Sequence, residues 1–397
     1  MKIALVNENG SPLASAGGDG PKGWQRALAQ SLARQGHQVT LYARNDGRDL
    51  PGRAVLGPGV AIEHLRAGPA RRLPALTLAQ HAGEFGERLA ARWRREAPDI
   101  AHAQHWTSGL AALAGCRGLG IPLVQTFSSP AVAEPRRGQP GPETAAEIRM
   151  EAAIARSVAG IAATCAPHVP ALARLGVPRT AIRVLPRGVD TARFTPDGPA
   201  APRSGRPRLL ALGPLTERQG LHTLLMALAD VPAAELILAG GPPPAQLRRD
   251  KACQAAARLA RKLRVRDRVT FTGAVPEGDL PALLRSADLL VSAAWYEPAG
   301  TAALKAMACG VPVLATDVGA LSDAVIHDTT GILLPPGQPS LFASRIRHLL
   351  ANPSRRQAYA IAAVDRARSR YSWDRIADQA TATYQQILQA PLPAPTS

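Results

Sequence analysis

The sequence has no apolar run long enough to cross a membrane, and it contains few cysteines. No segment approaches the roughly 20 apolar residues that a spanning helix needs, and the apolar start of MKIALVNENGSP is too short for a signal peptide. The four cysteines lie in apolar segments without metal-ligand spacing, at Cys116, Cys165, Cys253 and Cys309. We therefore expect a reducing compartment and a cytoplasmic protein, with peripheral contact to a membrane surface left open.

Aromatic residues and lysines are also scarce. Aromatic residues make up 4% of the 397 residues, and lysine occurs only at Lys2, Lys22, Lys251, Lys262 and Lys305. Arginine carries most of the positive charge, and the formal net charge of +17 favours anionic partners. Because no basic run is interleaved with aromatic residues and no zinc-finger or RNA-recognition signature occurs, we expect no nucleic-acid partner.

Short apolar runs alternate with helix-like stretches through both halves of the chain. Runs unbroken by polar alternation are typical of strands buried on both faces, hence of parallel sheets. Predicted strands are residues 2–6, 38–44, 100–106, 122–127 and 182–185, then 208–212, 235–239, 269–272, 289–293, 311–316 and 331–334. A segment rich in proline and glycine at 196–207 reads as a linker. The pattern predicts two doubly wound α/β domains, with ligands beyond the carboxyl ends of the strands.

A glycine-rich loop follows the first predicted strand. Gly18, Gly20 and Gly23 match GxGxxG, and Asp46 ends the next strand, so an NAD(P)-dependent oxidoreductase is an alternative. The dinucleotide fingerprint needs its first glycine directly after the strand, whereas here several residues intervene. We therefore interpret the loop, including Gly17 and Gly18, as backbone N–H groups that face an anion.

Several landmarks then occur in a fixed order. They are the glycine loop, PDIAHAQHW at 98–106, PRGVD at 186–190, GPLTERQG at 213–220, EPAG at 297–300, AMACGVP at 306–312 and TGILLP at 330–335. In this order the chain resembles GT-B glycosyltransferases of the family-4 type, which include sucrose-phosphate-synthase-like and inositol-glycosyl-transferring enzymes. The resemblance runs over nearly the whole chain.

The resemblance implies two Rossmann-like parallel-sheet domains that face each other across a cleft. We expect an acceptor-side domain at 1–195, the linker at 196–207 and a nucleotide-sugar-binding domain at 208–372. A helix at 373–390 would return to the first domain, and 391–397 would form a disordered tail. The resemblance further implies a metal-independent transfer that retains anomeric configuration, with no cofactor besides the nucleotide-sugar co-substrate.

Carried over residue by residue, the family motif assigns donor-binding positions in the second half. Glu297 would contact the transferred sugar, and Thr301 would cap a helix whose N-terminus, with the N–H groups of Gly300 and Thr301, faces the diphosphate. Lys305 stands where the family has a ribose-binding glutamate. Because lysine accepts no hydrogen bond and a cation near a helix N-terminus opposes the dipole, we expect a negative partner, either Glu297 or a donor phosphate.

Other positions also depart from the family pattern. Pro214 and Gln219 replace the arginine and lysine that hold the diphosphate, leaving Arg218 nearby. In the first half, Ser128 replaces a common histidine. His102, Gln104 and His105 lie near a motif that usually carries histidine. We assign Glu297, His102 and His105 to the catalytic site, Arg218 and Gln219 to the donor side, and Gln104 and Ser128 to the acceptor side.

Two functional hypotheses follow. In the first, the enzyme transfers a sugar to a small-molecule or lipid-linked acceptor, and Lys305 and Arg218 replace the missing phosphate cations. In the second, the scaffold has lost catalysis and serves as a binding or partner subunit, because losing transition-state cations removes several kcal/mol of stabilisation.

Overall fold

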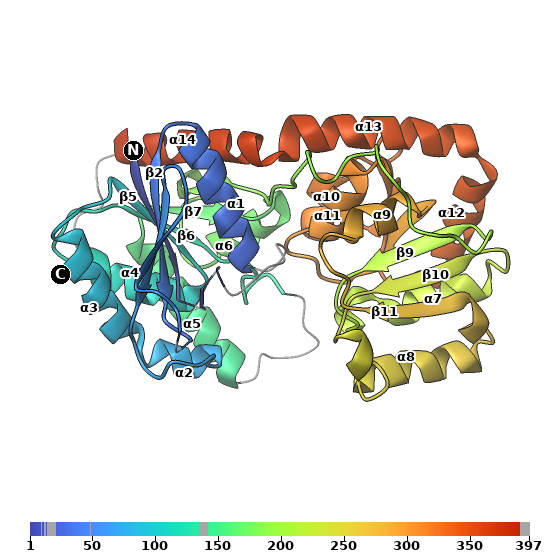
Figure 1. Cartoon of the computed structure of the whole chain (residues 1–397), viewed down its shortest axis with the longest axis horizontal. Helices are drawn as coiled ribbons and strands as arrows, with labels where there is room; N and C mark the ends of the chain where they lie inside the picture. The colour runs from blue at the N-terminus through green and yellow to red at the C-terminus, as the bar shows by residue number, and fades with distance from the viewer. Residues whose placement is uncertain (9, 12, 14–20, 48, 135–141, 390–397) are drawn as a thin grey trace. The chain divides into compact units, whose positions relative to one another are not determined.

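The computed structural model describes residues 1–8, 10–11, 13, 21–47, 49–134 and 142–389 (Figure 1). It divides into two compact units, one formed by Met1–Arg187 with Trp373–Ser397 and the other by Gly188–Ser372. The division falls earlier in the chain than the predicted domain end at 195, and the predicted linker lies within the second unit. The predicted tail, 391–397, and the glycines Gly17 and Gly18 lie outside the described residues.

The described residues of the first unit form an eight-stranded sheet of order β3-β4-β2-β1-β5-β6-β7-β8. All neighbouring strands are parallel except β3 and β4. The strands are β1 (Lys2–Asn7), β2 (Gln38–Arg44), β3 (Arg53–Gly57), β4 (Val60–Leu65), β5 (Ile100–Gln104), β6 (Leu123–Thr126), β7 (Gly160–Ala163) and β8 (Ile182–Val184).

Helices cover both faces of this sheet. They are α1 (Pro21–Arg34), α2 (Ala75–Ala79), α3 (Ala82–Trp93), α4 (Trp106–Cys116), α5 (Pro142–Ser157), α6 (Val169–Ala173) and α14 (Trp373–Gln389). Leu28 of α1 and Tyr384 of α14 pack with Leu5 and Leu41 on one face. Phe85 and Trp93 of α3 pack with Val6 on the other.

The described residues of the second unit form a six-stranded, wholly parallel sheet of order β11-β10-β9-β12-β13-β14. The strands are β9 (Arg208–Leu212), β10 (Glu235–Ala239), β11 (Val269–Gly273), β12 (Leu289–Ser292), β13 (Val313–Thr316) and β14 (Gly331–Leu334). Apolar runs such as RLLAL and ELILA build this sheet because both of its faces are covered.

The helices of the second unit also form two layers (Figure 1). They are α7 (Leu221–Ala229), α8 (Lys251–Lys262), α9 (Leu280–Arg285), α10 (Thr301–Ala308), α11 (Ala320–Ala324), α12 (Pro339–Ala351) and α13 (Pro353–Tyr371). Residues of α7, α8 and α12 share one core, and residues of α9, α10, α11 and α13 share the other.

The predicted fold class, two α/β domains with parallel sheets, is confirmed. Among the described strands, β3 departs from the parallel arrangement, because it pairs antiparallel with β4. The stretch 76–96 is helix-like in sequence but does not form a single helix, because α2 ends at Ala79 and α3 begins at Ala82. Within the described residues, no helix combines the length and the apolar character that crossing a membrane requires.

Candidate active-site residues

Glu297 lies in the loop that leads from β12 into α10, beyond the carboxyl end of the strand. Its Oε1 accepts hydrogen bonds from the backbone N–H groups of Ala299 at 3.1 Å and Gly300 at 3.0 Å. Gly300 has a φ of 66° and occupies the N-cap position without a side-chain cap. The predicted cap at Thr301 is therefore wrong, and the N–H of Gly300, expected to face a donor, is bonded to Glu297.

A second segment meets this loop at the Glu297 carboxylate. Gln219 ends a short 3₁₀ turn, Glu217–Gln219, and its Nε2 donates to Glu297 Oε2 at 3.3 Å. The turn is fixed to the same loop by Trp295, whose backbone N–H donates to Arg218 O and whose indole Nε1 donates to Glu217 O. The structure thus brings together Gln219, Glu297 and Gly300, three residues that the sequence assigned to the donor side.

Lys305 is buried, and its ammonium nitrogen lies 4.6 Å from the centre of the Phe194 ring. The negative face of an aromatic ring attracts a cation. The sequence left Glu297 and a donor phosphate open as partners of Lys305, and the Glu297 carboxylate is held by Gln219 and the loop amides. The dipole argument fails, because α10 ends at Ala308 and places Lys305 in its last turn, where a cation is favourable.

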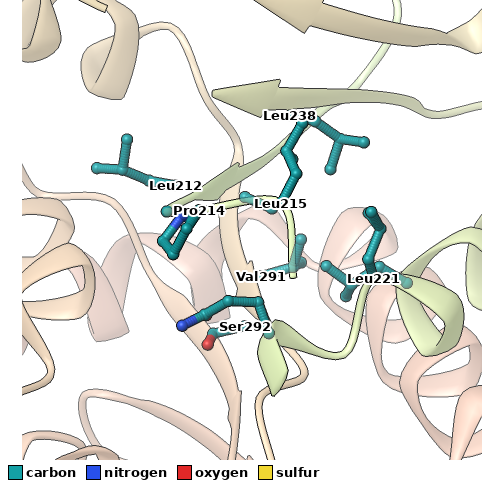
Figure 2. A pocket seen from close by; sticks show the side chains of 11 residues that line it. Leu212, Pro214, Leu215, Leu221, Leu238, Val291 and Ser292 are labelled. Carbon is teal, nitrogen blue, oxygen red and sulfur yellow. The ribbon is translucent and has the colours of Figure 1, made fainter. Parts of the chain in front are cut away.

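Arg218 and Pro214 lie on the same connection between β9 and α7. The Arg218 guanidinium carbon is 5.6 Å from the centre of the Tyr296 ring, so this cation stacks on the Glu297 loop. Pro214 lines a cavity of about 30 Å³ together with Leu212, Leu215 and Ser292 (Figure 2). A cavity of this size has room for ordered water.

His102 is fully enclosed within the first unit. Its Nε2 is 2.7 Å from Thr126 Oγ1 and its Nδ1 is 2.6 Å from Tyr384 Oη, so both ring nitrogens are satisfied internally. Burial lowers the pKa of His102 to about 3, which keeps the ring neutral. This geometry is that of a structural histidine, and it does not support the catalytic assignment of His102.

His105 lies just beyond the end of β5 in a strained conformation. Its φ is 69°, which is uncommon for a residue with a side chain and is often found at functional sites. The ring stacks on Trp106 with its centroid 6.0 Å away, and Nδ1 is 3.2 Å from Thr107 Oγ1. Burial lowers the pKa of His105 to about 4. A neutral imidazole thus stands at the carboxyl edge of the sheet.

Gln104 and Ser128 carry unsatisfied polar atoms close to this edge. Gln104 ends β5, is buried, and has no hydrogen-bond partner for either side-chain amide atom in the described structure. The Ser128 hydroxyl, two residues beyond β6, is also buried without a partner. Buried polar atoms without partners are rare and costly, so they indicate bound water or a ligand group.

Glu8 is a candidate that the sequence reasoning missed. It follows β1, is fully buried, and has no hydrogen-bond partner for either carboxyl oxygen in the described part of the chain. Burial raises the pKa of Glu8 to about 8, although Arg44 and Thr107 act in the opposite direction. β1 lies between β2 and β5, where the strand order reverses, and ligands bind at such switch points. An acid directly after the central strand is the signal that could have identified it.

Among the described residues, no group of three or more His, Cys, Asp or Glu side chains is arranged to hold a metal ion.

Each of the two units has its own set of candidate residues. The first unit contributes Glu8, Gln104, His105 and Ser128 at the carboxyl ends of β1, β5 and β6. The second contributes Gln219, Glu297 and Gly300 beyond β9 and β12.

Two α/β units with mainly parallel sheets, and polar residues at the carboxyl ends of the strands, are the architecture expected of GT-B glycosyltransferases. The chain belongs to that family: residues 25–193 match the Glycosyltransferase Family 4 model, and residues 197–366 match the model of Glycosyl transferases group 1. This membership identifies the protein as a glycosyltransferase and replaces the oxidoreductase alternative.

Particular relatives support the same assignment. The chain is 30% identical over 408 residues to D-inositol 3-phosphate glycosyltransferase 1 of Catenulispora acidiphila, covering 98% of this chain and 96% of the relative. A sucrose-phosphate synthase structure from Thermosynechococcus elongatus is 27% identical with a TM-score of 0.84, covering 98% and 100% of the two chains. Anabaena HepE in complex with UDP and glucose is similar in fold, with a TM-score of 0.73, 20% identity and 97% and 99% coverage.

Proposed function

We propose that the protein transfers a sugar from a nucleotide-sugar donor to an acceptor hydroxyl, without a metal and with retention of the anomeric configuration. The observation that carries this proposal is the fixed position of Glu297, whose carboxylate is held by two loop amides and by Gln219. A carboxylate held in this way is pre-organised to hydrogen-bond sugar hydroxyls. Structures of the similar fold in HepE contain UDP and UDP-glucose, which supports a nucleotide-linked donor.

The donor phosphates would meet a weaker positive charge than the family pattern provides. The Gln219 amide has two N–H groups, and one donates to Glu297, so the second is available to a phosphate oxygen. Arg218 stacks on Tyr296, next to the Glu297 loop, and supplies the cation on this connection. Catalysis would then rest on positioning and electrostatics, with the leaving phosphate taking the acceptor proton.

On the acceptor side we propose Gln104, His105 and Ser128, joined by Glu8. A neutral imidazole and unsatisfied amide and hydroxyl groups suit the recognition of a polyol. D-inositol 3-phosphate is the first acceptor to test, because relatives 30% identical to this chain carry it in their names.

The test has two steps. First, UDP-, GDP-, ADP- and dTDP-linked sugars are compared by thermal shift; a hundredfold excess over Kd stabilises by about 2.7 kcal/mol. Second, product formation with the stabilising donor is measured for the wild type and for Glu297→Gln. We expect one donor class to stabilise the protein and Glu297→Gln to lower turnover at least tenfold. No stabilisation by any donor would contradict the proposal.

A second candidate, a scaffold that binds a donor without turning it over, is favoured by the neutral residues Pro214 and Gln219. Gln219→Lys discriminates between the two. If the wild type forms no product and Gln219→Lys does, the second candidate, a scaffold without catalysis, is supported. If the wild type is active and this variant changes turnover only moderately, the chain has compensated for the missing cation.

A further inference from the structure

A groove runs beside β11, the edge strand of the sheet in the second unit. It has a volume of about 690 Å³, within the range of small-molecule sites. One wall comes from α8 and residues 244–248 before it, and the other comes from β11 and Arg266. We name it the arginine groove after four of its lining residues, Arg248, Arg258, Arg261 and Arg266.

The arginine groove carries positive charge without compensation. No aspartate or glutamate lines it, and none of its four arginines forms an ion pair within the described residues. Arg258 and Arg261 lie three residues apart on α8, a spacing at which like charges repel each other. A bound anion would remove that repulsion.

Part of the groove is held in place before any ligand binds. The Arg266 guanidinium donates from Nη1 to the backbone oxygen of Val269 at 3.0 Å and lies 5.7 Å from the centre of the Phe271 ring. Between the arginines, the lining includes the apolar residues Leu247, Ala257 and Phe271 and the polar residues Gln254 and Thr270. A fixed cation beside both apolar and polar side chains suits an anion that has an organic part.

We propose that the arginine groove binds a small, soluble organic ligand that carries two or more phosphate groups. Guanidinium groups bind phosphate oxygens in bidentate fashion, and several of them bind a multiply charged ligand together. None of the large apolar side chains exposed on the described surface lines the groove, so nothing there would enter a bilayer. This argues for a free ligand and against a lipid headgroup.

The groove is separate from the Glu297 and Gln219 residues. It lies along the outer side of β11, whereas Glu297 follows β12, and β10 and β9 stand between these strands. Three strand spacings correspond to about 14 Å. The inference therefore stands independently of the proposed donor site, and each can fail without the other.

Inorganic tripolyphosphate is a suitable probe, with binding measured by calorimetry at constant ionic strength. We expect Arg258→Gln/Arg261→Gln to weaken binding at least tenfold. The matched control is Arg345→Gln/Arg368→Gln, which removes two exposed arginines from α12 and α13 and should change affinity less than twofold. Gln219→Leu should leave the binding intact, which separates the groove from the donor side. Unfolding curves establish that each variant is folded.

Three outcomes would overturn the proposal. An equal loss of tripolyphosphate affinity in the two double variants would indicate a general effect of net charge. Unchanged affinity in Arg258→Gln/Arg261→Gln would show that tripolyphosphate binds outside the arginine groove. The third uses vesicles of phosphatidylcholine with phosphatidylglycerol. Co-sedimentation that depends on Arg258 and Arg261, with no tripolyphosphate binding, would assign the groove to a membrane surface.

Discussion

Lys305 shows how one position in a motif can change its chemistry while the motif keeps its place in the fold. The helix that carries it still begins directly after the Glu297 loop. The side chain, however, points to Phe194, and its methylene stem is buried in the unit. A cation in the last turn of a short helix, above an aromatic ring, is favourably placed.

Substitution of Lys305 should therefore affect stability before it affects chemistry. Lys305→Glu would place an anion over the negative face of Phe194 in a buried position, and we expect a loss of about 3 kcal/mol in the free energy of unfolding. Lys305→Met keeps the apolar stem and should cost about 1 kcal/mol. Urea unfolding of the two variants measures the difference. Equal stability of Lys305→Glu and the wild type would contradict this placement of the ammonium.

Glu8 should make the stability of the first unit depend on pH. Burial raises its pKa from 4.5 to about 8 in the folded state, so the folded protein binds this proton more tightly than the unfolded chain. The stabilisation is fully present below pH 4.5 and is lost as pH rises through about 8. Glu8→Gln removes this titration and should be the more stable protein above pH 8, by on the order of 2–4 kcal/mol.

The measurement is the free energy of unfolding of wild type and Glu8→Gln between pH 4.5 and 8.5, a range that brackets the shift. Glu87→Gln, an exposed glutamate on α3, serves as the control and should follow the wild type. Parallel curves for wild type and Glu8→Gln would show that Glu8 ionises normally in the folded protein.

At the level of elements, the Glu297 loop is held by a close backbone approach that only glycine permits. Gly319 has a φ of 50°, and a Cβ atom at this position would lie 2.2 Å from the backbone oxygen of Glu297. The same oxygen accepts a hydrogen bond from the N–H of Ala320 at 2.8 Å. The start of α11 therefore fixes the backbone of the loop, in addition to the bond that Gln219 makes to the Glu297 side chain.

Gly319→Ala should displace the Glu297 loop. We expect a loss of roughly 3 kcal/mol in stability and at least a tenfold drop in product formation, because the collision is with backbone. Gly337→Ala is the matched control, since Gly337 also has a positive φ of 74° but open space around it. It should cost about 1 kcal/mol and leave activity unchanged. If Gly319→Ala and Gly337→Ala had similar effects on stability and product formation, the close contact between Gly319 and the Glu297 backbone would have no specific role.

The elements that sequence reasoning predicted are those with strong apolar signals. All six strands of the second unit coincide with predicted runs: five are largely buried, and the edge strand β11, VTFTG, is partly exposed but rich in β-branched and aromatic residues. The strands β3, β4 and β7 were not predicted: β3 is half exposed with the pattern eieii, β4 carries the polar residues Glu63 and His64, and β7 is only the four residues GIAA. The break between α2 and α3, at Gln80 and His81, has no glycine or proline to mark it.

The place of Glu297 and Gly300, on a loop beyond the carboxyl end of a strand, was predicted because a motif fixes the backbone there. The direction of individual side chains was not predicted. The sequence cannot show that His102 points to Tyr384, 282 positions away, or that Lys305 points to Phe194. Glu8 was missed because its importance depends on burial, which sequence alone does not give.

At the scale of the whole molecule, the first unit is built from two distant parts of the chain. Tyr384 and Ile376 of α14 are buried with Trp24 and Leu28, and Tyr384 also bonds His102. The second unit, in contrast, is formed by one continuous stretch of chain, from Gly188 to Ser372. The two units should therefore respond differently when the chain is shortened at its C-terminus.

Truncation after Ser372 should unfold the first unit and spare the second. Loss of the α14 contacts removes roughly 5 kcal/mol of apolar burial, comparable to the net stability of a small domain. We expect limited proteolysis of the truncated protein to leave residues 188–372 as a resistant fragment. Residues 1–187 should be degraded unless a separate 373–389 peptide is added. Survival of 1–187 alone would contradict this dependence.

The split first unit also has a consequence for synthesis on the ribosome. Its first 187 residues emerge before the whole of 188–372 and only later receive α14. At about 5–20 residues per second, the surface around Trp24 and Leu28 stays uncovered for roughly ten to forty seconds. During that interval the nascent chain is a substrate for chaperones, and a pause in translation within the second unit would lengthen its exposure to aggregation.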